Sequence, residues 1–318
     1  MSGPAAKRSL VALDLSRCCR LTRAALVLPP TVCLRVLKAA GCLNLHEVVM
    51  QLPLHSPLQE LWLNNCKQLT KLVLVAPNLT LLHVGGCKQL GRLELRTPRM
   101  THLLANLCFR LSSLEAEVLA APRLEYLNLF GCRHLTGADL QVLVGQALGL
   151  KQLNVNGCSA LQELELQEHC ELKTVDVSGC RALACLSLSS PGLEEVQARA
   201  CKGLARLLLP SCRRLRLLDV AFCGQLREVG LAALPAARIA LEAEQAVSGS
   251  NAFRHMLRTE LLASAAKRCA AGLALQAIAV PHISGLSAAD GCEWLRQDQT
   301  LLLQLQVLRA AAKMSRSS

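Results

Sequence analysis

Residues 58–69 read LQELWLNNCKQL, and the same arrangement of leucines around a cysteine recurs ten times along the chain. In every copy a Leu follows the Cys by three residues, as Leu69 follows Cys66. These ladder cysteines lie 21 to 26 residues apart, at Cys18, Cys42, Cys66, Cys87, Cys108, Cys132, Cys158, Cys180, Cys201 and Cys223. A repeat of this period predicts a solenoid, because each short unit can bury its apolar residues only against its neighbours.

The segment before each ladder cysteine alternates between apolar and other residues, as a strand does. We expect Leu61 and Leu63 to face the core, while Trp62 between them faces solvent. Stacked coils would pair these strands into a parallel sheet. A second alternation follows most of the ladder cysteines, as in Leu72 and Leu74, and it predicts extended segments rather than helices at the back of those coils.

One coil and the end of the chain depart from this pattern. The coil from Cys132 to Cys158 is longer, and the helical spacing of apolar residues within 136–147 predicts one helix there. After Cys223 the repeat continues for one degenerate coil and then stops. We therefore expect a solenoid over residues 1–242, followed over residues 243–318 by a helical C-terminal cap or tail.

The composition limits the class of protein. The chain has 318 residues and is 52% hydrophobic, yet no stretch approaches the roughly 18 uninterrupted apolar residues of a membrane span. The N-terminus carries Lys7 and Arg8 without the apolar core of a signal peptide, so we expect a cytoplasmic or nuclear protein with no membrane contact. Thiols stay reduced in these compartments, so we expect the ladder cysteines to be free and buried rather than bridged or bound to zinc.

The repeat L-x-x-L-x-L-x-x-C-x-x-L resembles the cysteine-containing subclass of leucine-rich repeats, best known from F-box/leucine-rich-repeat substrate receptors of ubiquitin ligases. Leu135, Thr136 and Gly137 resemble the segment that follows the cysteine in that family, and the short coils are most similar to its plant type. The resemblance implies an α/β solenoid: a right-handed superhelix with a parallel concave sheet and mostly extended convex segments. It also implies substrate recognition for an SCF-type ligase. Only nine residues precede Leu10 and none forms an F-box, so we expect a ligase scaffold as partner only if that module lies upstream.

The outward strand positions are the first candidate for a binding surface. They carry three of the few aromatic residues of the chain among Asn, His and small residues, a mixture typical of contacts with a protein or peptide. The alternatives are that this face packs against the C-terminal tail, or that its aromatic residues occur there by chance and have no binding role. The candidate residues on this concave face are Trp62, Asn64, His83, His102, Asn106, Tyr126, Asn128, Phe130, Asn154 and Asp176.

The residue directly after the ladder cysteine is the second candidate. It is basic in five coils, which predicts a row of positive charge along one rim: Lys67, Lys88, Arg133, Arg181 and Lys202. These residues could simply be solvated turn positions. With a formal net charge of +12, they could also attract an acidic partner, or nucleic acid as the lesser alternative. The aromatic content of 2% disfavours a platform on which bases stack.

Residues with the chemistry of an active site are not found together. His83 and His102 lie on neighbouring predicted strands and could approach each other, but no carboxylate cluster or serine nucleophile motif accompanies them. We therefore expect no catalytic residues, no metal and no cofactor. The sequence favours a protein-interaction scaffold related to F-box receptors, with a protein that binds nucleic acid or an acidic partner as the alternative.

Overall fold

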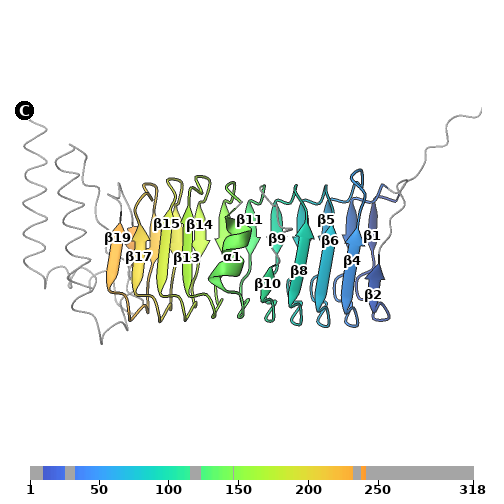
Figure 1. Ribbon diagram of the computed structural model, residues 1–318, viewed down its shortest axis with the longest axis horizontal. Helices are drawn as coiled ribbons and strands as arrows, with labels where there is room; N and C mark the ends of the chain where they lie inside the picture. The colour runs from blue at the N-terminus through green and yellow to red at the C-terminus, as the bar shows by residue number, and fades with distance from the viewer. Residues whose placement is uncertain (1–9, 26–32, 115–122, 146, 232–237, 241–318) are drawn as a thin grey trace, which may run out of the picture. The chain divides into compact units, whose positions relative to one another are not determined.

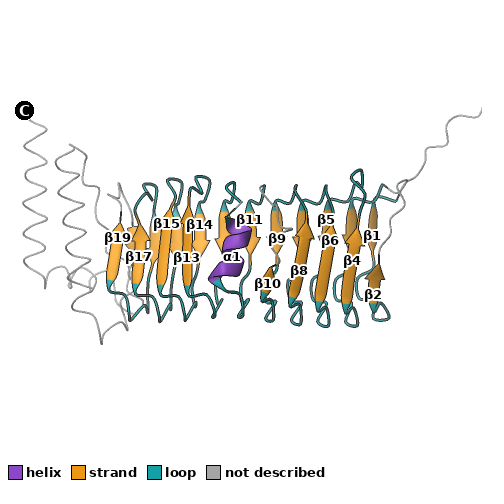
Figure 2. Cartoon of the chain, in the orientation of Figure 1, coloured by secondary structure: helices purple, strands orange, loops and turns teal. Residues whose placement is uncertain are grey.

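A computed structural model describes residues 10–25, 33–114, 123–145, 147–231 and 238–240. The described chain is a parallel β-solenoid in which short strands follow one another coil by coil (Figure 1), and strands far outnumber helix (Figure 2). It divides after Cys158 into two compact units, residues 1–158 and 159–318. The predicted helical tail over residues 243–318 lies outside the described residues.

The first unit contains two parallel sheets. The front sheet is built from the strands that precede the ladder cysteines, in the order β1 (Ala12–Asp14), β3 (Val36–Lys38), β5 (Glu60–Trp62), β7 (Leu81–His83), β9 (His102–Leu104), β11 (Tyr126–Asn128) and β12 (Gln152–Asn154). The back sheet is built from the strands that follow them, in the order β10 (Ser113–Leu114), β8 (Arg92–Arg96), β6 (Lys71–Val75), β4 (Glu47–Gln51) and β2 (Arg23–Ala25). The prediction of extended segments at the back of the coils is confirmed.

The longer coil carries the helix that its sequence predicts. Helix α1 spans Gly137–Val144 and lies beside β10. Thr136 caps its N-terminus, because the Thr136 hydroxyl accepts a hydrogen bond from the backbone N–H of Asp139, whose carboxylate accepts one from the N–H of Thr136. Leu140 and Leu143 are buried, so the helix takes the place of a back strand in closing this part of the core.

The second unit repeats the same plan. Its front sheet has the order β14 (Thr174–Asp176), β16 (Glu195–Gln197), β18 (Leu217–Asp219) and β20 (Arg238–Ala240). Its back sheet has the order β13 (Glu163–Gln167), β15 (Cys185–Ser189), β17 (Arg206–Leu209) and β19 (Glu228–Leu231). Since β20 pairs with β18, strand pairing continues past Cys223 where the sequence predicts a degenerate coil.

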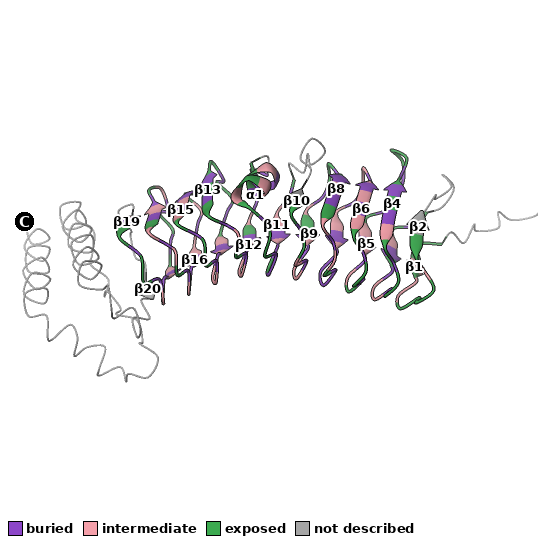
Figure 3. Cartoon of the chain, turned by 60° about the horizontal axis from the view of Figure 1, so that its bottom comes forward, coloured by how far each residue is buried: buried purple, intermediate pink, exposed green. Residues whose placement is uncertain are grey.

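The core of each unit lies between its two sheets. Burial alternates along the strands, so that Leu61 of β5 and Leu72 of β6 are both fully buried while their neighbours are partly exposed (Figure 3). In the parallel pairing, Leu61 lies beside Leu37 and Leu82, and every coil therefore adds one layer to a continuous apolar stack.

The ladder cysteines stabilise the stacking through their thiols as well as by packing. The Cys108 thiol donates to the carbonyl oxygen of Val84 at 3.2 Å, and the backbone N–H of Cys87 donates to the same oxygen at 3.2 Å. The accepting carbonyl thus lies three residues before the ladder cysteine of the preceding coil. The bond recurs from Cys42 to Leu15, Cys66 to Ala39, Cys87 to Leu63, Cys132 to Ala105, Cys158 to Leu129, Cys201 to Val177 and Cys223 to Ala198. A cysteine suits this position because it is apolar enough for the core and still donates one hydrogen bond.

The turn before each ladder cysteine needs a left-handed backbone. The residue just before the cysteine has a positive φ in all ten coils: Gly41, Gly86, Gly131, Gly157 and Gly179 in five of them, and Arg17, Asn65, Leu107, Ala200 and Phe222 in the others. Glycine adopts this conformation without strain, whereas a residue with a Cβ costs roughly 1–2 kcal/mol. The ladder turn is therefore strained where a side chain is present, and Leu107, with φ of 58°, is one such place.

The prediction of buried ladder cysteines is confirmed except at the first coil. The described cysteines are free, and nine of the ladder cysteines are buried. Cys18 is exposed, which contradicts the prediction. Its coil contributes β1, which pairs only with β3 among the described strands, so no described coil covers Cys18 from the other side.

We expect Leu63→Ala to lower the free energy of unfolding by about 2–5 kcal/mol, as truncations of buried leucines do. Leu63 is 2% exposed and fills a coil between two others. Urea denaturation followed by circular dichroism measures the loss. Leu54→Ala is the matched control, because Leu54 is 76% exposed. Equal effects of the two substitutions would contradict the placement of Leu63 in the core.

We expect the free energy of unfolding to fall as pH rises from about 9 towards 12. Burial raises the pKa of the Cys132 thiol from its ordinary value of 9.0 to about 12, and it also raises the pKa of Cys108. The unfolded chain releases these protons first, so the stability that the neutral thiols contribute is complete below pH 9 and is lost as pH approaches the folded pKa. Chemical denaturation across this range measures the decline.

The variant Cys132→Ala controls for the other groups that ionise at high pH, and it should show a shallower decline. Thiol labelling gives a second readout, since Cys108 and Cys132 should react slowly in the folded protein while exposed Cys170 reacts fast. Fast native labelling of the buried cysteines would contradict the ladder.

Candidate functional site

The register of the front sheet sorts the outward side chains of the first unit into rows. Residues at the ends of the strands form one row across β5, β7, β9, β11 and β12: Trp62, His83, Leu104, Asn128 and Asn154. Residues at the starts of the strands form another: Glu60, Leu81, His102, Tyr126 and Gln152. Because parallel strands lie about 4.8 Å apart, side chains in one row contact their neighbours directly.

Trp62 and His83 form the first aromatic pair. Their ring centroids are 5.2 Å apart and the rings meet edge to face at 71°. The indole N–H of Trp62 donates to Glu60 Oε2 at 3.0 Å, and Lys38 Nζ lies 5.8 Å from the centroid of the Trp62 ring. These contacts fix the orientation of an aromatic side chain that is still partly exposed.

His102 and Tyr126 form the second pair, in the other row. Their rings stack with centroids 5.8 Å apart and an interplanar angle of 24°. His102 Nδ1 is 2.9 Å from the hydroxyl of Thr101, which restrains the imidazole. Beside them, Lys151 Nζ lies 2.8 Å from Glu125 Oε2, and the hydrogen bond from Lys151 holds the pKa of Glu125 below its ordinary value.

The imidazole of His83 is held in a poorly hydrated position. Burial lowers its pKa below the ordinary 6.5, and its Nδ1 has no hydrogen-bond partner among the described residues. Gly85 makes room for this arrangement, since a Cβ at that position would stand 2.9 Å from His83 Nε2 and 2.4 Å from Asn106 Oδ1. The imidazole therefore stays neutral next to Trp62 at neutral pH.

The predicted approach of the two histidines is not found. His83 pairs across the sheet with Leu104 and contacts Trp62, whereas His102 pairs with Leu81 and Tyr126. They lie in different rows because His102 starts its strand and His83 ends one. Among the residues that the structure describes, no group of three or more His, Cys, Asp or Glu side chains could hold a metal ion.

Several predicted polar contacts serve the turn instead. The side-chain oxygens of Asn128, Asn154 and Asp176 accept hydrogen bonds from the backbone N–H groups two residues further on, at 3.0, 3.0 and 2.9 Å. Such bonds end the strand and begin the turn towards the cysteine. Asn64 and Asn106 are half-buried at the next outward positions, where Phe130 is 39% exposed.

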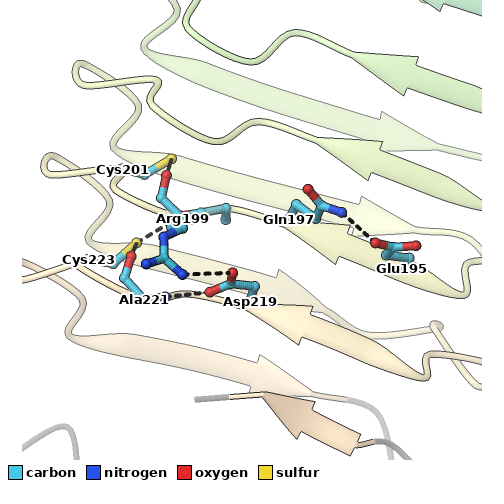
Figure 4. A network of polar contacts seen from close by, with 8 residues as sticks. Glu195, Gln197, Arg199, Cys201, Asp219, Ala221 and Cys223 are labelled. Carbon is cyan, nitrogen blue, oxygen red and sulfur yellow. Dashed lines mark hydrogen bonds and ion pairs between the residues drawn. The ribbon is translucent and has the colours of Figure 1, made fainter. Parts of the chain in front are cut away.

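In the second unit the outward side chains contact one another (Figure 4). Gln197 donates to Glu195, and Arg199 Nη1 lies 3.9 Å from Asp219 Oδ2. The other carboxylate oxygen of Asp219 accepts the N–H of Ala221 at 2.9 Å. The Arg199 guanidinium also lies over the ring of Phe222, 4.8 Å from its centroid. The aromatic pairs thus distinguish the front sheet of the first unit.

The five predicted rim cations are exposed. Lys67, Lys88 and Arg133 follow the ladder cysteines of the first unit, and Arg181 and Lys202 follow those of the second. Phe109 occupies the same position after Cys108 and was not among the residues predicted from the sequence. Lys88 Nζ lies 5.6 Å from the Phe109 ring centroid and Arg133 Cζ lies 4.8 Å from it, so an aromatic ring stands between two cations. The sequence does hold a signal for Phe109, because neighbouring coils have Lys or Arg at its position.

Comparisons with known proteins do not assign a family. No family model and no curated protein matches the chain. Among solved structures, it aligns with the functional domain of InlJ from Listeria monocytogenes, which includes a cysteine ladder. The identity is 17%, the alignment covers 68% of each chain, and the TM-score is 0.25. A TM-score this low does not support a conclusion about the fold or the function of this protein. In the described part of the chain, no helix is long and apolar enough to cross a membrane.

We expect the imidazole of His83 to titrate below pH 6.5 and its pKa to rise in Trp62→Ala, because removing the indole exposes the ring to water. Protonation is resisted in the folded state, so the contribution of His83 to stability is lost as pH falls below about 6.5. NMR of the imidazole protons measures both effects. Tyr126→Ala is the control and should leave His83 unchanged. A His83 pKa that Trp62→Ala does not move would contradict this packing.

Proposed function

We propose that this chain is a protein-interaction scaffold whose contact surface is the outward face of β5, β7, β9 and β11. The observation that carries the proposal is the two aromatic pairs, Trp62 with His83 and His102 with Tyr126, at outward positions of four neighbouring strands. Aromatic side chains supply large contact areas, and residues of this kind dominate the binding energy of protein interfaces.

The packing of these rings supports the proposal because it limits the side-chain conformational entropy that would be lost on binding. Trp62 is held by His83, Glu60 and Lys38 before any partner arrives, so little side-chain freedom remains to be lost. The half-buried Leu81 and Leu104 lie between the two pairs in the register and extend the apolar character of the face. A partner with an extended or flat apolar segment fits these rows.

A finer assignment follows from the resemblance of the repeat to F-box receptors. On that basis, the scaffold would recognise a substrate protein for an SCF-type ubiquitin ligase. The support is the spacing of leucines and cysteines in the repeats. Co-purification of a ligase scaffold with the protein expressed from its full gene tests this assignment.

A second candidate function uses the rim. Five exposed cations and a net charge of +12 favour an acidic partner, with nucleic acid as the lesser option. Retention on heparin and on duplex DNA across a salt series separates the two. Strong salt-sensitive retention on DNA that is lost when Lys67 and Lys88 are changed to Glu would favour nucleic acid.

We expect the combined variant Trp62→Ala, Tyr126→Ala, Phe130→Ala to lose its main partners from cell extract, with recovery falling about tenfold or more. Quantitative mass spectrometry of captured proteins measures the loss, and circular dichroism verifies that the variant is folded. The reason is that three ring surfaces are removed from one face while the core leucines stay in place.

The matched control is Val49→Ala, Leu54→Ala, Leu148→Ala, which removes exposed apolar side chains elsewhere. It should retain the partners. Reversing the charge of Lys67 and Lys88 should weaken binding only in a salt-dependent way. A folded aromatic variant that keeps every partner would show that this face is not the contact surface.

A further inference from the structure

The corner that follows Cys108 differs from the neighbouring corners of the first unit. Phe109 stands there between Lys88 of the preceding coil and Arg133 of the next, with cation-to-centroid distances of 5.6 and 4.8 Å. Phe109 is half-buried while both cations are exposed. We call Lys88, Leu107, Phe109 and Arg133 the Phe109 corner.

The turns around this corner are uniformly free of acidic residues. They read CKQL at 66–69, CKQL at 87–90, CFRL at 108–111 and CRHL at 132–135. Lys67, Lys88, Arg110 and Arg133 are all exposed on these four consecutive turns. Positive charge therefore gathers on both sides of one aromatic ring, and the field of the corner attracts carboxylates.

Leu107 gives a second, independent reason to regard the corner as a site. It has a φ of 58° at the position where the turns on either side use Gly86 and Gly131. Its side chain occupies the space that the missing side chain of Gly131 leaves, with Leu107 Cδ2 standing 3.1 Å from where a Cβ would be. The ring of Phe109 borders the same space, with Cε1 at 3.8 Å. Leu107 and Phe109 thus bring apolar surface to a corner whose exposed side chains are cationic.

We propose that the Phe109 corner binds an acidic peptide segment of a partner protein, with one apolar side chain of that segment seated against Phe109 and Leu107. Carboxylates on either side of that anchor pair with the positive charges of Lys88 and Arg133. The two cations already lie over the ring, so they lose little freedom when the peptide binds. The proposal rests on the proposed function only in taking the partner to be a protein, and it uses none of Trp62, Tyr126 or Phe130.

A peptide fits these observations better than nucleic acid does. Single strands bind along a succession of exposed rings on which bases stack, whereas the corner offers one half-buried ring. Lys88 and Arg133 lie on either side of that ring, so they can pair with carboxylates that flank an apolar residue in contact with Phe109. That arrangement matches a short acidic segment with an apolar residue in its centre.

Panning a displayed library of short random peptides against the purified full chain tests the proposal. We expect the enriched peptides to carry an aliphatic or aromatic residue flanked by Asp or Glu. Synthetic copies of these peptides should bind Phe109→Ala and the double variant Lys88→Glu, Arg133→Glu about tenfold or more weakly than the original chain, measured by fluorescence anisotropy. The double variant changes only exposed side chains, so it keeps the test decisive if Phe109→Ala fails to fold.

The matched control is Arg181→Glu, Lys202→Glu, which makes the same charge change at the same repeat position in the second unit and should leave the peptide affinity within about twofold. The variant lacking Trp62, Tyr126 and Phe130 should also bind these peptides normally, which separates this site from the front sheet. Enriched peptides that are not acidic, or that bind all variants equally, would overturn the proposal. It would be overturned equally if no peptide is enriched, or if a fluorescent DNA duplex alone depends on Lys88 and Arg133.

Discussion

The thiol-to-carbonyl hydrogen bond between consecutive coils is the interaction on which the rest of this structure depends. At the ladder turn the chain leaves the front strand, and the buried carbonyl of a residue such as Val84 accepts one backbone hydrogen bond from its own coil. The thiol of Cys108, one coil later, supplies the second. A carbonyl oxygen can accept two hydrogen bonds, and the thiol of the next coil occupies the second site, so each coil adds a bond to the turn of the one before it.

This dependence fixes the proposed contact surface as well as the core. Because the coils stack with every turn in the same register, Leu61, Leu82 and Leu103 lie side by side inside the first unit. The residues that flank them must then lie side by side outside. Trp62 meets His83, and His102 meets Tyr126, as a consequence of where the buried leucines stand. The aromatic pairs are thus positioned by the core, on strands that cannot shift by one residue without turning their leucines outward.

The sequence predicts the parts of this arrangement that depend on spacing. The back strands, helix α1 and the neighbouring positions of Trp62 and His83 all follow from counting residues within a coil. The geometry of side chains between coils does not follow from counting. The bonds of Asn128 and Asp176 to their own turns, the separation of His83 from His102 and the two cations over Phe109 depend on rotamers and on which end of a strand a residue occupies. Exposed Cys18 shows a further limit, because the repeat pattern is the same whether or not a coil has a neighbour on each side.

The regular register has a consequence for how such a chain can change over evolutionary time. Consider a gene lacking the codons for residues 67–87, one complete coil. Cys66 would then take the place of Cys87 in the ladder. The thiol of Cys108 would donate to the carbonyl of Leu63 in place of that of Val84, and Leu61 would pack beside Leu103 in place of Leu82. The solenoid would close over the gap with its core chemistry intact, but Trp62 would now lie beside Leu104 instead of His83. Unequal recombination between repeats would therefore leave the architecture unchanged while rewriting the surface, so that new binding specificities can arise in single genetic events without passing through an unfolded intermediate.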